Sequence, residues 1–415
     1  MENNSEKSQT KIIASTNVFQ IEFVEKLGKE DYPPLISISL HLAKEYGRQA
    51  VLTKNTIEKY FDGKKSLPFI ARYQNEIIGY IIGIPLEELR EENWAVNDEN
   101  FGKYYRIMKV ALFGATGFVG SYIVDELISQ GMDANLMVRE GSENKLLQKE
   151  KCRIIKGDID DKIAINETLD GCGAVIYAIG IIREFPNRGI TYENLHFNGA
   201  KRCIDAAKEK GINRFILMSA NGAKMNGTSY QSTKYNSEEY LKFSDLDYTI
   251  FRPSLIFGDP RGNDRPEFCT QLKKDMLNLP FPAPNFHKGF NPLKAGDFAM
   301  SPIHIKDVAS IFVKSIKEMS LVKKTYCLGG DTYYWKDIIK IISSAYGKKK
   351  WTIPAPAIII QGFAFLFDRF QWFPITKDQI TMLLESNVCH SGELFKLFDV
   401  SPIPFSPESL TYLRN

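Results

Sequence analysis

The sequence lacks the features that would indicate a membrane-spanning, secreted or nucleic-acid-binding protein. Its longest apolar stretch, residues 355–367, is shorter than the roughly 18 residues of a membrane-spanning helix, and Gln361 interrupts it. The N-terminus has no apolar signal core, so we expect a cytoplasmic protein. A net charge of +3 without a large basic block gives no reason to expect a nucleic-acid partner. We interpret the short basic run at residues 348–350 as a solvated helix end.

Cysteine and histidine are few and scattered. The six cysteines form no C-x-x-C pair, and neither His196 nor His304 has a spaced set of metal-binding side chains around it. We therefore expect no metal site, reduced and buried thiols, and histidines that are packed or at the surface. The length of 415 residues allows two or three domains, each with its own core.

The most informative stretch is residues 109–120, KVALFGATGFVG. Its first half has the composition of a buried strand, and residues 121–130 have the apolar spacing of a helix. In a dinucleotide-binding turn, one glycine permits the tight turn, one admits the pyrophosphate and one lets helix and strand pack closely. Glycines also mark ordinary turns, but here the flanking strand and helix favour the nucleotide site. We predict cofactor contacts from Gly114, Thr116, Gly117, Phe118, Val119 and Gly120.

From residue 109 onward, predicted strands and helices alternate, which indicates an α/β fold with a doubly wound parallel sheet. The further strands are predicted at 134–138, 153–156, 174–178, 214–219 and 248–252. Residues at the ends of these strands are expected to border the cofactor: Arg139, Asp158, Ala178, Gly180 and Pro253.

Arg139 bears on the choice of cofactor. An acidic residue at this strand end would bind the ribose hydroxyls of NAD, whereas a basic one favours the extra phosphate of NADP. We therefore expect a preference for NADP(H), with NAD(H) as the alternative; a solvated arginine is the plain reading. Asp158 could accept a hydrogen bond from an adenine amino group or simply cap the next turn.

A tyrosine and a lysine four residues apart, Tyr230 and Lys234, fall on one face of a predicted helix. A phenol with a pKa of about 10 is a poor acid–base group near neutrality unless a nearby cation stabilises its phenolate. Other Tyr-x-x-x-Lys pairs exist, but only this one follows a strand that ends in a serine, Ser219. The pair therefore suggests a catalytic site, against the alternative of a solvated helical pair.

Together these motifs resemble the extended or atypical short-chain dehydrogenases/reductases over residues 108 to about 345. The likeness rests on the glycine turn, Gly157-Asp158, Asn198, Ser219, Tyr230-x-x-x-Lys234, 252–258 and 302–309. Within that superfamily the chain looks closest to the branch of the nucleotide-binding accessory subunit of respiratory complex I. The resemblance implies that Tyr230 is the acid–base residue and that Lys234 also binds the nicotinamide ribose. It further implies that Ser219 orients the substrate oxygen and that Asn198 supports the helix geometry and a proton-relay water.

Residues 1–105 are predicted to form a small α+β module. A strand at 18–24, helices at 34–46 and 56–61 and a hairpin at 68–84 resemble the front half of the GNAT acetyltransferase fold. The pyrophosphate loop of that family is missing before Lys109, so we interpret the module as truncated and without an anchor for acetyl-CoA. Residues 1–12 are expected to be disordered.

In the remaining domain, 108–415, residues 259–300 and 331–415 are predicted to form a substrate or C-terminal lobe. Four phenylalanines would give it an apolar lining: Phe281, Phe286, Phe290 and Phe298. The aromatic segment 363–373 is expected to be buried or to line the pocket, with contact to a membrane surface or a protein complex as the alternative. The oligomeric state is not predicted.

These features predict an NAD(P)(H)-dependent oxidoreductase that acts on a small, apolar carbonyl or enone compound. The alternatives are a non-catalytic NADPH-binding scaffold or assembly protein, and a sugar epimerase or dehydratase.

Overall fold

The computed structural model describes residues 8–16, 19–46, 52–61, 66–83, 109–262, 265–289, 291–367 and 375–414. The chain divides into two compact units, Met1–Arg106 and Ile107–Asn415, which are best considered separately.

Within the described residues, the first unit has a four-stranded antiparallel sheet and two α-helices. Its strands β1 (Gln9–Ser15), β2 (Phe19–Lys26), β3 (Leu67–Tyr73) and β4 (Glu76–Gly83) are paired in that order. Helices α1 (Tyr32–Tyr46) and α2 (Lys54–Tyr60) contribute Leu35 and Ile57 to a core shared with the sheet. The likeness of this unit to an acetyltransferase remains a prediction.

Strand β1 contradicts the expectation of disorder for residues 9–12, whereas residues 1–7 of that predicted stretch lie outside the described residues. It pairs with β2 from Gln9 to Ser15, yet almost all of its residues are exposed. Backbone pairing rather than side-chain burial therefore stabilises it. Such a strand has no alternation of buried and exposed residues from which it could be predicted.

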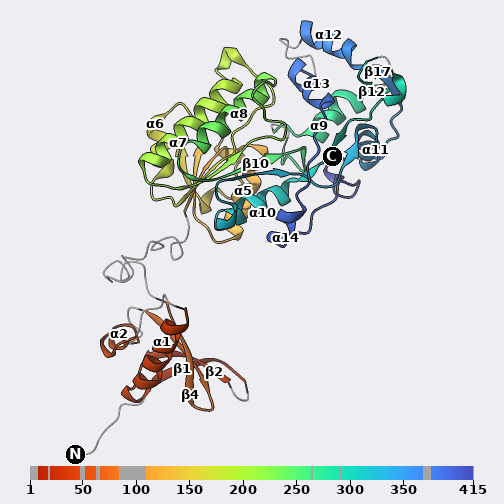
Figure 1. The fold of residues 1–415 in the computed structure, drawn as a ribbon. Coiled ribbons are helices and arrows are strands. Elements are labelled where there is room, and N and C mark those ends of the chain that lie inside the picture. Colours follow the sequence, from red (N-terminus) through yellow and green to blue (C-terminus); the bar gives the residue numbers. More distant parts are fainter. Residues whose placement is uncertain are drawn as a thin grey trace, which may run out of the picture. The chain divides into compact units, whose positions relative to one another are not determined.

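The second unit contains a parallel sheet of seven strands in the order β15-β10-β9-β8-β5-β6-β7 (Figure 1). Their bounds are β5 Val110–Phe113, β6 Ala134–Val138, β7 Arg153–Lys156, β8 Ala174–Tyr177, β9 Arg214–Met218, β10 Asp247–Pro253 and β15 Lys324–Leu328. The central strand β5 is apolar throughout because helices cover both faces of the sheet. The strand order reverses between β5 and β8, so the predicted doubly wound Rossmann fold is confirmed.

Two sets of helices pack on the two faces of this sheet (Figure 1). On one face lie α5 (Phe118–Ser129), α10 (Ile305–Ser315) and α14 (Gly392–Leu397). On the other lie α6 (Lys162–Leu169), α7 (Gly199–Glu209) and α8 (Ser229–Lys242). The seventh strand, β15, was not predicted, because it is an edge strand whose residues are mostly exposed or half-buried.

A third core builds the C-terminal lobe around the buried Trp335. Its helices are α9 (Phe268–Leu272), α11 (Trp335–Ala345), α12 (Ala357–Phe367) and α13 (Lys377–Leu384), and β12 (Ala283–His287) pairs with β17 (Thr352–Pro356). Two shorter pairs complete it: β11 (Ile256–Phe257) with β14 (Ile303–His304), and β13 (Ala299–Met300) with β16 (Tyr333–Tyr334).

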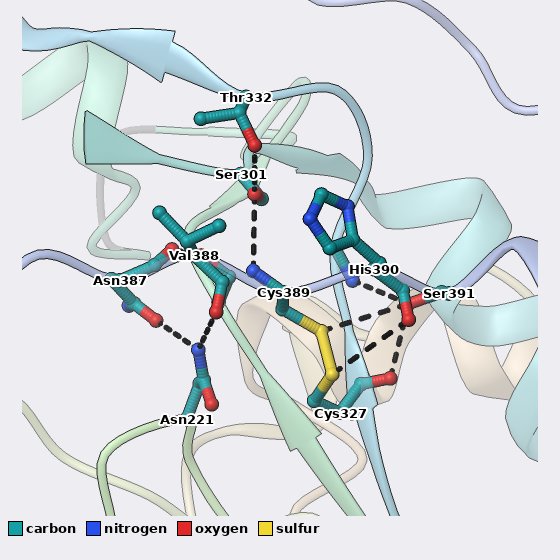
Figure 2. Close-up of a disulfide and its surroundings, with 11 residues drawn as sticks. Asn221, Ser301, Cys327, Thr332, Asn387, Val388, Cys389, His390 and Ser391 are labelled. Atoms are coloured by element: carbon teal, nitrogen blue, oxygen red, sulfur yellow. Dashed lines mark hydrogen bonds between the residues drawn. A yellow bond between two sulfur atoms is a disulfide. The ribbon is translucent and has the colours of Figure 1, made fainter.

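Cys327 and Cys389 form a disulfide between the end of β15 and the segment that follows α13 (Figure 2). The prediction of reduced thiols is therefore wrong for this pair, whose Cα atoms lie 5.9 Å apart although 62 positions separate them in sequence. Around the bridge, the Asn221 amide donates to Asn387 Oδ1 at 2.7 Å and to the Val388 carbonyl at 3.1 Å. The disulfide thus fastens a segment that also contacts the loop after β9.

We expect loss of this disulfide to lower the free energy of unfolding by roughly 2–4 kcal/mol, because it closes a long loop in the unfolded chain. Urea unfolding of the wild type and of a Cys327→Ala/Cys389→Ala variant, each with and without reductant, measures this. Reductant should destabilise the wild type but not the double variant, and the control Cys152→Ala, which loses a free thiol and keeps the disulfide, should respond as the wild type does. Wild-type stability that does not respond to reductant would contradict the prediction.

Candidate active site

The turn after β5 and the start of α5, residues 114–120, form a cradle in which glycine stands where a side chain would collide with the backbone. Gly114 has a φ of +98°, and a Cβ on it would lie 2.9 Å from the backbone carbon of Ala178. A Cβ on Gly120 would lie 2.0 Å from the Gly114 carbonyl oxygen. Gly117 is the N-cap of α5. The free N–H groups at the start of that helix therefore lie at the point where the strand order reverses. The cradle fits the pyrophosphate of a dinucleotide.

The other predicted turn residues differ in their surroundings. Phe118 begins α5 half-buried, whereas Val119 belongs to the hydrophobic core under the sheet. The Thr116 carbonyl accepts a hydrogen bond of 3.0 Å from Arg265 Nε. Since the Val119 side chain is in the core, this residue can face a cofactor only with its backbone.

Arg265 holds the turn in place and was not predicted from the sequence. Its guanidinium is buried and also donates to the carbonyls of Pro260 at 3.1 Å and Lys145 at 2.5 Å. Burial lowers its pKa from the ordinary value, and backbone carbonyls are its hydrogen-bond partners. Arg265 joins three loops that are distant in sequence, and no local pattern marks such a residue.

The residues predicted at strand ends all lie at the carboxyl edge of the sheet. Arg139 follows β6 and is exposed, and Pro253 is the buried last residue of β10. Asp158 Oδ1 accepts a hydrogen bond of 2.6 Å from the Ile159 N–H, so this carboxylate caps its own turn. Ala178 is buried, and its N–H donates to the Phe113 carbonyl. Gly180 lies beside the lysine site, since a Cβ there would be 3.5 Å from Lys234 Nζ.

The Lys234 ammonium is buried between the ends of β8 and β9. Its Nζ donates to the Met218 carbonyl at 3.0 Å and to the Ile179 carbonyl at 3.3 Å. Burial lowers the pKa of Lys234 to about 8, although the Glu238 carboxylate opposes this shift. The ammonium is therefore fixed beside the predicted cofactor groove.

Tyr230 packs edge-on against two rings, Tyr192 at 5.6 Å and His196 at 5.1 Å between ring centroids. Burial raises the pKa of Tyr230 to about 12. The expectation that a neighbouring cation stabilises the phenolate is therefore not met, because Lys234 bonds to backbone carbonyls instead. At neutral pH this phenol is protonated.

His196 is the unexpected member of the site. The Ile181 N–H donates to its Nε2 at 3.1 Å, Thr233 Oγ1 lies 3.3 Å from its Nδ1, and its ring stacks on Tyr192. Burial and the Lys234 charge lower the pKa of His196 well below its usual range, so the imidazole is neutral. The sequence indicated a packed histidine but not its place beside Tyr230.

The local helix geometry explains why His196 rather than Asn198 meets Tyr230. Residues Glu193–Asn198 form a π-helical turn, a geometry that is often found at functional sites. Asn198 is the last residue of this turn. Its side chain is half-buried and makes no hydrogen bond within the residues that the structure describes.

The Ser219 hydroxyl donates to the buried Glu238 carboxylate, one helical turn beyond Lys234 on α8. Arg252 holds the same carboxylate with two hydrogen bonds, of 2.8 Å from Nε and 2.5 Å from Nη2. In this arrangement the only Ser219 proton is shared with Glu238, so donation to a substrate would require this hydrogen bond to break; the role of Ser219 remains a prediction.

A cavity of about 690 Å³ opens beside Tyr230. Tyr192 and Ser229 form its inner wall, and the loop 183–188 and the start of α13 form the rest. The side chains around it are mostly polar: Arg183, Glu184, Asn187, Arg188, Ser229, Thr376 and Asp378.

The predicted phenylalanine lining is wrong. Phe286 and Phe298 pack on Trp335 in the core of the lobe, with ring centroids 6.2 and 5.4 Å from the indole. Phe281 is 70% exposed, and Phe290 lies outside the described residues. Phe286 and Phe298 therefore stabilise the core of the lobe, and Phe281 faces solvent.

The lowered pKa of Lys234 predicts a pH-dependent stability. Between about pH 8 and 10.5 the unfolded chain binds more protons at this residue than the folded one. The free energy of unfolding of the wild type should therefore rise through this window relative to Lys234→Met, by on the order of 3 kcal/mol. Denaturant unfolding of both proteins on either side of the window measures the difference, and parallel pH profiles would count against a buried ammonium.

In the described part of the chain, no three His, Cys, Asp or Glu side chains cluster as metal ligands would. None of the described helices combines the length and the apolar character needed to cross a bilayer.

Comparisons with known proteins agree with the interpretation of the glycine cradle as part of a dinucleotide-binding domain. Residues 114–273 match a family described as NAD(P)H-binding, which confirms the predicted dinucleotide site at the family level. The 40 kDa subunit of NADH-ubiquinone oxidoreductase from Neurospora crassa is 24% identical over 312 residues, 73% of this chain and 78% of the relative. A ceramide reductase from Caulobacter vibrioides is 24% identical over 263 residues, 61% of this chain and 76% of the relative.

Among solved structures, UDP-glucose 4-epimerase from Thermus thermophilus, in complex with NAD, shares the fold with a TM-score of 0.56 and 15% identity. The similarity covers 74% of this chain and 98% of the epimerase.

Proposed function

We propose that this chain, a member of the extended short-chain dehydrogenase/reductase-like family with an NAD(P)-binding Rossmann domain, is an NADP(H)-dependent reductase of a small carbonyl or enone compound. One observation carries the proposal: Lys234, His196 and Tyr230 lie together near both the glycine turn and a cavity of substrate size. Lys234 donates to Ile179, which lies against Gly114, and Tyr230 packs on Tyr192, a residue of the cavity wall. When bound, the nicotinamide would supply the hydride.

The protonation state of Tyr230 supports the direction of reaction. A phenol whose pKa is raised to about 12 is protonated at neutral pH, so it can donate a proton to an alkoxide but is a poor base. The resting form of the phenol is therefore the one that reduction of a carbonyl requires, whereas the reverse reaction requires the phenolate. Lys234 would bind the ribose, and His196 would hold the Tyr230 ring in place. Ser219 would be a positioning residue that acts through its hydrogen bond to Glu238. The relay role of Asn198 remains part of the proposal.

Two further features support the finer choices of cofactor and substrate. The exposed Arg139 at the end of β6 suits the additional phosphate of NADP. The relative that is named a ceramide reductase supports carbonyl reduction and an apolar substrate. The polar rim of the cavity would then contact a polar group next to the carbonyl.

Titration of the protein with NADPH and NADH, followed by turnover with a panel of carbonyl and enone compounds, tests the proposal. NADPH should bind more tightly than NADH, and Tyr230→Phe should bind NADPH normally but lose turnover by about 10²–10⁴-fold. Tyr235→Phe, on the same helix, is the matched control and should keep full activity. Loss of turnover in neither variant would exclude Tyr230 as the proton donor.

A second candidate, a scaffold or assembly protein that binds NADPH without consuming it, has its own support. The Ser219 proton is committed to Glu238, and one relative is a subunit of a respiratory complex. Tightly bound NADPH that no carbonyl compound oxidises would favour this candidate. Sugar epimerase or dehydratase activity has the support of the fold alone.

We propose that this protein is located at the surface of a membrane, as a peripheral protein. The respiratory-complex relative supports contact with a membrane-associated assembly. A cytoplasmic compartment suits the Cys327–Cys389 disulfide less well, because structural disulfides are rare in reducing surroundings. The first unit, residues 1–105, is assigned no part in catalysis.

A further inference from the structure

We propose that helix α12 and the adjoining β12–β17 pair bind the surface of a bilayer that contains anionic lipid. Figure 1 shows α12, α13 and the two strands together at the outer end of the C-terminal lobe. Three observations carry the proposal: the orientation of α12, the aromatic residues beside it and the charge of the segments that form the surface.

Helix α12 is oriented with its small residues inward. Ala357 and Ala364 are buried, whereas Ile358 and Phe365 are each 69% exposed. Ile359 and Leu366 are also more than half exposed. A helix on a soluble protein ordinarily turns its large apolar side chains toward the core, so this arrangement marks an interaction surface.

Two exposed aromatic residues flank the strand pair that adjoins α12. Trp351, which immediately precedes β17, is 81% exposed, and Phe281, just before β12, is 70% exposed. They lie at the same end of the strand pair, because the Ala283 N–H donates to the Trp351 carbonyl at 2.7 Å. Exposed tryptophan next to lysine is typical of protein surfaces at the lipid headgroup level.

The segments that form and adjoin this surface are basic. The segments 276–289 and 338–367 contain no aspartate or glutamate, but five lysines: Lys288, Lys340, Lys348, Lys349 and Lys350. Lys377, on α13, lies 5.5 Å from the Phe365 ring centroid. An apolar stripe beside basic residues is complementary to anionic headgroups over acyl chains.

The size of α12 fixes the mode of contact. Its 11 residues span roughly 16 Å, about half the hydrocarbon thickness of a bilayer, so the helix would lie in the interface. The basic run at 348–350 would then act as a lipid contact and not only as a solvated helix end.

Docking would also place the cavity next to the bilayer. Helix α12 packs against α13, and Thr376 and Asp378 at the start of α13 line the cavity. A membrane-resident carbonyl compound could therefore enter from the lipid side; this consequence, unlike the docking itself, rests on the proposed function.

Co-sedimentation of the full chain with phosphatidylcholine vesicles, with and without phosphatidylglycerol, tests the docking in the absence of nucleotide. Binding should require phosphatidylglycerol and weaken with salt. A Phe365→Gln/Leu366→Gln variant should lose at least about tenfold in affinity, and Lys348→Gln/Lys349→Gln should lose most of the preference for anionic vesicles.

Matched variants on the Rossmann domain provide the controls. Ile163→Gln/Phe243→Gln changes two residues that are 76% and 81% exposed, and Lys149→Gln/Lys151→Gln removes the same charge; both should bind vesicles as the wild type does. Circular dichroism reports that each variant is folded.

The proposal is overturned if the wild type binds neither vesicle, or if control and test variants lose affinity equally. It is also overturned if light scattering finds a dimer that only Phe365→Gln/Leu366→Gln dissociates, without vesicle binding, since a second copy then covers α12. Because the assay needs neither nucleotide nor turnover, failure of the proposed reductase activity leaves this result unaffected.

Discussion

Replacing Glu238 by alanine lowers the free energy of unfolding by roughly 3 kcal/mol, the lower end of the range for breaking a buried ion pair. The carboxylate is fully buried and accepts hydrogen bonds from Arg252 and Ser219. Its removal leaves a guanidinium without its counter-ion and a buried hydroxyl without its acceptor. The lower end applies because the Arg252 side chain is 26% exposed and can be partly solvated.

The neighbouring Glu239 provides the matched control. It lies on the same helix, and its carboxylate is one-third exposed and pairs with Lys242 at 2.8 Å. Glu239→Ala should cost less than about 1 kcal/mol, since exposed ion pairs contribute little. Urea unfolding of both variants gives the comparison, and equal losses would show that the Glu238 network is not a buried unit.

Replacing Gly120 by alanine should weaken NADPH binding by at least about a hundredfold, which corresponds to about 2.7 kcal/mol. The added Cβ would lie 2.0 Å from the Gly114 carbonyl oxygen and 2.9 Å from Ala115 Cα. Both atoms belong to the backbone, so α5 itself must move away from β5. The free N–H groups at its start would move away from the pyrophosphate.

Gly392→Ala is the control for this prediction. Gly392 begins α14 on the same face of the sheet, and a Cβ there would meet nothing within 4 Å. NADPH fluorescence titration with circular dichroism on both variants separates lost binding from lost folding. A Gly120→Ala protein that binds NADPH as the wild type does would mean that the cradle is not the nucleotide site.

Six of the seven strands of the Rossmann sheet, together with the glycine turn, could be predicted from the sequence. A glycine turn, a buried strand and an amphipathic helix are local signals, read over about a dozen neighbouring residues. The alternation of strands and helices adds the parallel order, because right-handed crossovers leave few other arrangements. The position of Tyr230 and Lys234 on one helix face follows from the same short-range geometry.

Tertiary structure alone decided which groups meet in the site. His196 reaches Tyr230 through a π-helical turn, and Arg265 binds a carbonyl 149 positions away. The Ser219 hydroxyl donates to Glu238. These contacts depend on the packing of elements that are far apart in sequence, and hydrogen-bond partners are chosen only after burial has removed water.

Tertiary packing also explains why the apolar C-terminal lobe could be predicted while the direction of its side chains could not. Composition indicated an apolar C-terminal lobe, but the sequence could not tell whether its rings would face a cavity, a core or solvent. Packing places Phe286 and Phe298 against Trp335 and leaves the large apolar side chains of α12 outside. Likewise, Cys327 and Cys389 become partners only because β15 joins the sheet edge. Local periodicity fixes which elements form, whereas the direction in which each side chain points depends on which surface its element is packed against.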